Sequence, residues 1–356
     1  MLWLQYALES IDKKRAPMIP YPETLWQIIL MAMLLIAAVI NAVHQAEVIA
    51  HKTGEPLGTL VLAISVTIIE VALIVSIMLS AGADGALIAR DSVFAAVMIV
   101  MNGVIGVSIF LGGLRHHTLS FRVEGTNSSL AVLIALAVLT LVMPNFTTTT
   151  PGPTFSNSQL MLAGVLSLVL YGTFVFIQTV RHRDYFLPTH DTELVDPESH
   201  APAPSNTKTL ISVVLLLISL VAVVLLAKAL SPSIESAIDT VGAPRSVVGI
   251  AIALLVLLPE GVAATRAAMA NRLQTSLNLS LGSALASIGL TIPAVAFISI
   301  FFDLPLSLGV DSLGMTFLAL TFLLSLLTIA IGRATVLQGV VHLVIFAAYL
   351  FLSLVP

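Results

Sequence analysis

The stretch LGTLVLAISVTIIEVALIVSIML at residues 57–79 carries one charge, Glu70, in 23 residues. As an α-helix it would measure roughly 34 Å at about 1.5 Å per residue, which is enough to cross the hydrocarbon core of a bilayer. A second stretch, VVGIAIALLVLLPEGVAA at residues 247–264, has Glu260 as its only charge. An acidic side chain near the middle of a membrane helix is costly, so both glutamates are predicted to be functional residues.

The composition of the whole chain agrees with these two stretches. Its 356 residues are 58% hydrophobic and 10% charged, and the mean hydropathy is +1.06. Soluble domains are about 25% charged, so we expect an all-α polytopic membrane protein whose surroundings are the lipid bilayer. The chain has no cysteine, which excludes disulfides, thiolate metal sites and cysteine nucleophiles. The net charge of −4 is spread over loops, and we expect no nucleic-acid partner.

Apolar runs separated by charged or Pro/Gly-rich breaks predict about ten membrane-spanning helices. The expected spans are Leu25 to Val43, Leu57 to Leu79, Ser92 to Leu114, Ser129 to Pro144, Gln159 to Val180, Leu210 to Leu230, Val247 to Ala268, Leu277 to Phe301, Leu313 to Ile331 and Val336 to Leu354.

The longest polar break divides these helices into five and five. It gives an N-terminal arm at 1–24, a first five-helix repeat at 25–180, an acidic loop at 181–208 and a second five-helix repeat at 209–356. Because each half crosses the membrane an odd number of times, two related halves would be inverted with respect to each other, with sites near the midplane where they meet. Setting the halves against each other places Glu70 opposite Glu260 and Asn102 opposite Ser287.

Basic residues in the short loops predict the orientation, because they accumulate on the cytoplasmic side. Nine lie on one side of the expected helices and six on the other. This excess places the acidic loop in the cytoplasm and both termini outside.

Two carboxylates brought together at mid-depth predict a site made of oxygen ligands. Hard cations such as Ca²⁺ and Na⁺ prefer these ligands. In a low dielectric both acids cannot ionise without a cation, so at least one should hold a proton when no cation is bound, and cation and proton would compete. The neutral oxygens expected to support Glu70 and Glu260 belong to Thr67, Asn102, Asn278, Ser283 and Ser287.

Other roles for these residues stay open at this point. Pro259 removes a backbone donor and frees the carbonyl of Leu255, so it predicts either a simple kink or a broken helix that adds carbonyl ligands. Either glutamate alone is compatible with a protonated structural acid. Asn102 and Ser287 equally suit hydrogen bonds that hold helices together.

These residues resemble a known group of proteins. The segments GEPLG at 54–58, IIEV at 68–71, PEG at 259–261 and LNLSLGS at 277–283 resemble the two alpha-repeats of the calcium:cation antiporter superfamily, especially its ChaA-type bacterial Ca²⁺/H⁺ and Na⁺/H⁺ branch. The resemblance implies ten core helices in inverted repeats, with Glu70 and Glu260 as the cation and proton carboxylates. One departure is Ser287, which stands where many proton-exchanging relatives have glutamine.

The predicted function is therefore secondary antiport of a cation against protons by alternating access. Ca²⁺ export is the first choice, and Na⁺ or K⁺ are further candidates. A gated cation channel is the alternative, although the rings of pore-lining groups that channels use are not evident. We expect no enzyme activity and no cofactor, and the expected location is a bacterial inner membrane. The sequence does not predict an oligomeric state.

Overall fold

The structure is a computed structural model that describes residues 24–53, 57–187, 204–241, 244 and 246–355. Almost all of the predicted N-terminal arm at 1–24 lies outside these residues. So does residue range 188–203, which is most of the predicted acidic loop.

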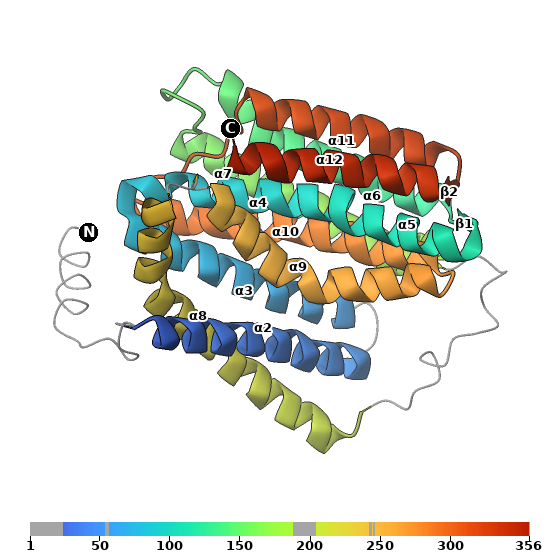
Figure 1. Cartoon of the computed structure of the whole chain (residues 1–356), viewed down its shortest axis with the longest axis horizontal. Helices are drawn as coiled ribbons and strands as arrows, with labels where there is room; N and C mark the ends of the chain where they lie inside the picture. The colour runs from blue at the N-terminus through green and yellow to red at the C-terminus, as the bar shows by residue number, and fades with distance from the viewer. Residues whose placement is uncertain (1–23, 54–56, 188–203, 242–243, 245, 356) are drawn as a thin grey trace.

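Long helices run side by side through the molecule (Figure 1). The elements are α2 (Leu25–Thr53), α3 (Leu57–Ala81), η1 (Gly82–Leu87), α4 (Ile88–Met98), η2 (Ile99–Val104), α5 (Ile105–His116), β1 (Thr118–Ser120), α6 (Val123–Ala137), η3 (Val138–Val142), η4 (Met143–Phe146), α7 (Asn157–Phe176), η5 (Ile177–Arg181), η6 (Arg183–Phe186), α8 (Asn206–Val241), α9 (Ser246–Met269), α10 (Leu273–Phe302), α11 (Ser312–Ala330), β2 (Arg333–Thr335) and α12 (Val336–Leu354).

The predicted all-α membrane fold is confirmed. Within the described residues, nine helical segments are long and apolar enough to cross a bilayer. Helix α3 adds a shorter apolar stretch at Ile64–Met78. The segments α4, η2 and α5 form one of the nine spans, and η2 within it is a turn of π-helix. Large apolar side chains are exposed on α2, α7 and α8, as expected for surfaces that face lipid.

The predicted end of the first helix is wrong. We expected it to stop at Val43, but α2 continues to Thr53. Two of its polar side chains are satisfied: Asn41 Nδ2 donates to Ser219 Oγ of α8 at 2.7 Å, and Gln45 Nε2 donates to Asn41 Oδ1 one turn earlier in α2 at 3.1 Å. The predicted end at Val43 therefore marked the point where polar residues begin to interrupt the apolar run, and the helix itself continues for ten more residues.

The two halves of the chain pack reciprocally. Helix α7 packs on α10, and α12, which holds the same place in the second half, packs on α5. Figure 1 shows α2 and α8, the first helices of the two halves, running in opposite directions. The opposite directions of these two helices are consistent with an inverted relation between the halves, and the division into two five-helix repeats stays a prediction.

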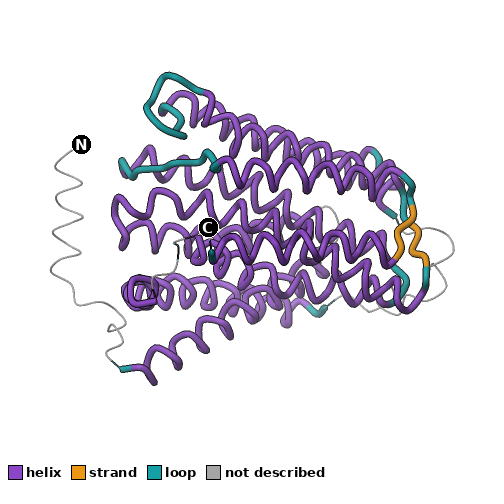
Figure 2. Tube along the Cα trace, turned by 45° about the horizontal axis from the view of Figure 1, so that its top comes forward, coloured by secondary structure: helices purple, strands orange, loops and turns teal. Residues whose placement is uncertain are grey.

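A short antiparallel ribbon joins the halves at one end of the bundle, where Figure 2 shows the only described strands in orange. Strand β1 follows α5 and pairs with β2, which precedes α12, so that Thr118 lies opposite Thr335. Nearby, His116 Nε2 lies 2.9 Å from the carbonyl oxygen of Met269 at the end of α9. The C-terminal ends of α5 and α9 therefore lie together at this end.

Two groups of buried apolar side chains form the interior. The larger group involves α4 to α7 and α10 to α12, and the smaller involves mainly α2, α3 and α8. Helix α9 contributes to both: Ala253 and Leu257 belong to the larger group, and Ile252 and Val256 to the smaller. The boundary between the two groups therefore runs along α9.

Candidate functional site

Glu70 of α3 is held by hydroxyl groups of α10. Ser287 Oγ lies 2.7 Å from Oε1 and 2.8 Å from Oε2 of the glutamate, and Thr291 Oγ1 donates to Oε2 at 2.8 Å. Ser287 and Thr291 are four residues apart, so they lie on one face of the helix. The glutamate is only 2% exposed. Its carboxyl group is therefore both enclosed and fixed in position.

Glu260 of α9 is also buried, at 9% exposure, but its carboxyl group has fewer hydrogen-bond partners than that of Glu70. Its Oε2 atom is inaccessible to solvent and has no hydrogen-bond partner among the described residues. A buried polar atom without a partner costs on the order of 1–3 kcal/mol, more when it is charged. Such an atom is expected where a proton or a ligand completes the site.

A cavity of about 100 Å³ adjoins Glu260. Helices α3, α7 and α10 and segment η5 form its other walls. The lining residues are Val66, Tyr171, Phe174, Val175, Gln178, Glu260, Asn278, Leu279, Gly282, Ser283 and Ala286. Gln178 lies at the C-terminal end of the α7 span and Asn278 near the start of α10, so the cavity leads from Glu260 towards the end of the bundle that carries residues 181–187.

No basic side chain is among the recorded partners of Glu70 or Glu260 in the described part of the chain. The negative charges of Glu70 and Glu47 both act on Glu260. Glu47 lies on the part of α2 beyond its predicted end, within 3.9 Å of His44 Nδ1. The local charge is thus acidic, and neutralising it requires protons or an added cation.

Several predicted site residues are brought to one of the glutamates. Ser287 bonds to Glu70, and Ser283 and Asn278 line the cavity with Glu260. Asn278 also accepts a hydrogen bond from Gln274 and donates one to the carbonyl of Phe186 at 2.6 Å, which fixes its amide at the cavity mouth.

Thr67 is buried three residues before Glu70. Pro259 precedes Glu260 inside α9, and the helix continues through it to Met269. Figure 1 shows α9 changing direction near its middle. The structure therefore has a kinked helix rather than the broken helix that we considered.

Asn102 is not brought to either carboxyl group. Its Nδ2 donates to Thr321 Oγ1 at 2.8 Å, and its Oδ1 lies 3.1 Å from Nδ1 of His342. Nε2 of that histidine lies 3.1 Å from Thr328 Oγ1. The asparagine thus belongs to a buried network that joins η2 to α11 and α12.

Sequence reasoning missed four features of the site. Thr291 was detectable, because it lies four residues after Ser287 and therefore on the same helix face. Gln178 was a polar side chain that, with Thr179, interrupts an apolar run. Tyr171 and Gly282 gave no such signal. A Cβ atom added at Gly282 would meet nothing within 4 Å, so this glycine borders open space.

The arrangement can exchange protons for a cation. The two carboxyl groups supply four oxygens, and the hydroxyls of Ser287, Thr291 and Ser283 supply neutral oxygens on α10. These hard ligands suit Na⁺ or Ca²⁺. Within the described residues, no three histidine, aspartate or glutamate side chains converge to hold a metal ion.

Comparison with known proteins gives consistent results. The model of the family described as "Sodium/calcium exchanger protein" matches residues 24–180 and 211–355. The chain is 49% identical over 329 residues to "Putative ionic transporter y4hA" of Sinorhizobium fredii (strain NBRC 101917 / NGR234), covering 92% of this chain and 89% of that protein. It is 35% identical over 316 residues to "Sodium-potassium/proton antiporter ChaA" of Escherichia coli (strain K12), covering 89% and 85%.

A solved structure of native YfkE has a similar fold. It superposes with a TM-score of 0.71 at 16% sequence identity, over 98% of this chain and 96% of that chain.

Proposed function

The chain belongs to the sodium/calcium exchanger protein family, and from this premise we propose that it exchanges a cation for protons at Glu70 and Glu260. The family consists of cation antiporters in the membrane, so the chain is an integral membrane protein that moves ions rather than an enzyme. The observation that carries the finer proposal is the pair of buried glutamates with no recorded basic partner in the described residues.

The first step of the argument is electrostatic. Two ionised carboxylates in a low dielectric repel each other and lose their hydration, so the pair stays neutral by binding protons or a cation. A divalent cation neutralises both carboxylates at once, whereas a monovalent cation leaves one of them to a proton. Cation and protons therefore exclude each other at the same oxygens, which is the basis of antiport.

The second step concerns access. The cavity beside Glu260 leads to the end of the bundle where the acidic loop is expected, and the loop is expected in the cytoplasm. Glu70, by contrast, is enclosed by Ser287 and Thr291. These differences support a state in which Glu260 is reached from the cytoplasm and Glu70 becomes a ligand only when its hydroxyl bonds rearrange.

The exchange then follows from alternating access. A cytoplasmic cation enters by the cavity and displaces the proton from Glu260. The Ser287 and Thr291 hydroxyls then release Glu70. When the cation is divalent, Glu70 also gives up its proton to the cytoplasm and its carboxylate completes the cation site, whereas a monovalent cation leaves one proton on the pair. Reorientation of the halves opens the site to the other side, where protons displace the cation. We propose export of Ca²⁺ across a bacterial inner membrane, with Na⁺ and K⁺ as the competing substrates.

The ligand chemistry and the named relatives favour different cations. Ca²⁺ takes 6–8 oxygen ligands, and two glutamates with neighbouring hydroxyls provide most of such a shell. The relative from Escherichia coli is named as a sodium-potassium/proton antiporter. An ion series must therefore accompany any test of the mechanism.

The test is proton flux in vesicles containing the purified protein. Imposed gradients of Ca²⁺, Na⁺ or K⁺ should drive proton movement, and Glu70→Gln or Glu260→Gln should reduce it at least about 100-fold, the cost of losing one partner of a buried charge pair. Glu124→Gln makes the same change at an exposed position on α6 and should leave the flux unchanged. Cation movement without protons would instead show a channel, and normal exchange by both glutamine variants would remove the glutamates from the mechanism.

A further inference from the structure

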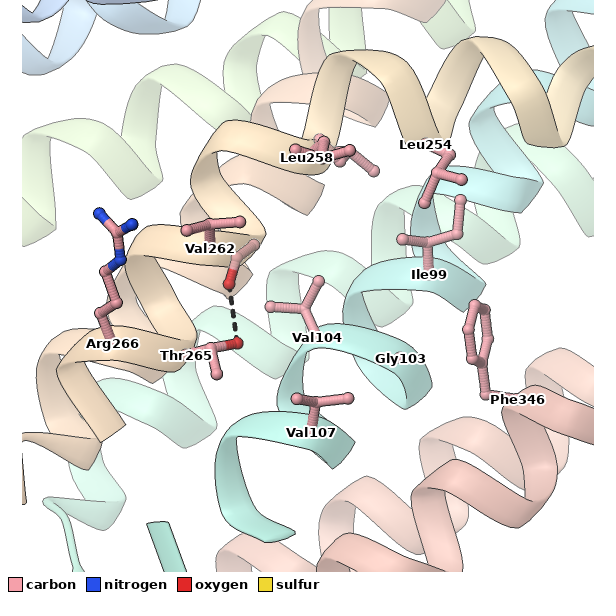
Figure 3. Close-up of a pocket in the computed structure, with 12 residues that line it drawn as sticks. Ile99, Gly103, Val104, Val107, Leu254, Leu258, Val262, Thr265, Arg266 and Phe346 are labelled. Carbon is pink, nitrogen blue, oxygen red and sulfur yellow. Dashed lines mark hydrogen bonds between the residues drawn. The ribbon is translucent and has the colours of Figure 1, made fainter. Parts of the chain in front are cut away.

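A groove of about 340 Å³ runs along the outer face of α9 (Figure 3). One wall is α9 itself, and the other walls are η2, the start of α5 and Phe346 of α12. The lining residues are Ile99, Gly103, Val104, Val107, Leu254, Leu257, Leu258, Gly261, Val262, Thr265, Arg266 and Phe346. The groove is separate from the cavity beside Glu260, with which it shares no residue. Its volume falls in the range of about 300–1,000 Å³ that is typical of ligand sites.

The groove faces the hydrocarbon core of the bilayer. Leu254, Leu258 and Val262 are exposed by 47%, 50% and 41% along α9, a membrane-spanning helix. Exposed apolar side chains on such a helix are in contact with lipid chains. The material that fills the groove must therefore be apolar and flexible.

Arg266 is the charged group of this groove, and it lies at one end of the row of apolar side chains in Figure 3. It is exposed, and it takes part in none of the ion pairs recorded among the described residues. The neighbouring Thr265 hydroxyl donates to the carbonyl of Gly261 at 2.8 Å, so it is already satisfied. Arg266 is thus the group at this end that can receive an anion.

Arg266 can reach the headgroup region on one side of the bilayer. With Glu260 at mid-depth, Arg266 lies six residues further along α9, or roughly 9 Å along an α-helix. Half of a hydrocarbon core is about 15 Å thick, and a long arginine side chain carries its guanidinium group over the remaining distance. The guanidinium group therefore reaches the headgroups of the leaflet towards which the chain's β-ribbon points.

We propose that this groove binds an anionic phospholipid, with one acyl chain along α9 and the headgroup phosphate on Arg266. A guanidinium group binds phosphate oxygens with paired N–H donors, and a basic residue near a membrane surface favours anionic over neutral lipids. The groove wall includes Gly261, which directly follows Glu260, so the bound chain contacts the helical turn that carries the glutamate.

Lipid retention by the purified full-length protein tests this proposal without reference to transport. The protein is equilibrated with mixed detergent micelles of phosphatidylglycerol and phosphatidylcholine, and bound lipids are counted by native mass spectrometry. We expect one retained phosphatidylglycerol, and we expect Arg266→Gln to weaken its preference over phosphatidylcholine about fivefold. Arg333→Gln, which removes an exposed arginine from β2 at the same end of the bundle, is the control and should keep the preference.

A second pair of variants tests the acyl chain. Val262→Phe fills the groove and should reduce retention of both lipids, whereas Val224→Phe makes the same change on α8 at a similar exposure of 39% and should not. Equal losses from both arginine variants would show general surface attraction and overturn the proposal. Unchanged lipid retention by Val262→Phe in folded protein would overturn it as well.

Discussion

The surroundings of Glu70 and Glu260 differ although the two residues hold corresponding places in the two halves. Glu70 accepts hydrogen bonds from Ser287 and Thr291 and is 2% exposed. Glu260 has an unpartnered oxygen and adjoins a cavity. Two related halves in identical conformations would treat their acids alike. Both acids are buried, but Glu70 is held by hydroxyl groups whereas Glu260 lies beside a cavity, and this is the kind of difference that the proposed one-sided access predicts.

The largest effect should come from shortening each glutamate by one methylene group. Glu70→Asp withdraws the carboxyl group from Ser287 and Thr291, and hydrogen bonds to charged groups contribute about 1.5–3 kcal/mol each, so cation-driven proton flux should fall about 100-fold. Glu260→Asp loses no recorded side-chain hydrogen bond and should cost about tenfold. Cation-driven proton flux in vesicles measures both losses. If Glu70→Asp and Glu260→Asp lost the same amount of flux, the hydroxyl contacts of Glu70 would not make its role different from that of Glu260.

The next effect concerns the donors themselves. Ser287→Ala removes a neutral oxygen that we propose as a ligand of the cation once the hydroxyl has released Glu70, and it should weaken the apparent cation affinity about tenfold. Thr291→Val removes a single contact while keeping the shape of the side chain, so its effect should be smaller. Proton flux as a function of cation concentration gives the affinities. Combining each variant with Glu70→Gln should add no further loss, because the partner of the hydroxyl has then changed.

A smaller effect should follow from narrowing the cavity beside Glu260. Gly282→Val adds a side chain where a Cβ atom would meet nothing within 4 Å, so we expect slower exchange by roughly threefold and an unchanged melting temperature. Gly289→Ala is the contrast, because its Cβ would lie 2.8 Å from Cβ of Tyr171. That variant should lower the melting temperature. If Gly282→Val exchanged at the normal rate, the cavity would not be part of the route by which ions reach Glu260.

The smallest effect on transport is expected for Asn102, the counterpart of Ser287 in the sequence alignment of the halves. Asn102→Ala breaks contacts to Thr321 and His342 on the far side of η2 and should destabilise the protein by about 1–3 kcal/mol. The apparent cation affinity should change less than twofold. Thermal unfolding in detergent and flux in vesicles measure the two quantities separately. A tenfold loss of affinity would place Asn102 in the cation site.

The sequence predicted most of the helices because long apolar runs are required wherever a helix is surrounded by lipid and by other apolar helices. It placed both lone acids inside apolar helices and named Ser287 among the neutral oxygens near them, and Ser287 bonds to Glu70 in the structure. It did not predict that α2 runs to Thr53, since its polar residues find partners: Asn41 bonds to Ser219 of α8, and Gln45 bonds to Asn41 within α2.

The sequence also could not separate Ser287 from Asn102. Both are uncharged polar residues in apolar helices, and only the packing of α10 against α3 and of η2 against α12 directs them to different partners. The difference between Glu70, which is held by hydroxyl groups, and Glu260, which lies beside a cavity, is a property of conformation that a pattern of residues does not encode.

The ribbon of β1 and β2 has a consequence for biosynthesis. The residues that pair with β1 are synthesised roughly 200 residues later, after α11 has been completed. At about 5–20 residues per second, a growing chain carries β1 without its partner for on the order of 10–40 s. During that interval the end of the first half has a free strand edge at the membrane surface. The ribbon that begins with β1 after α5 is therefore completed only when β2 has been synthesised, directly before α12.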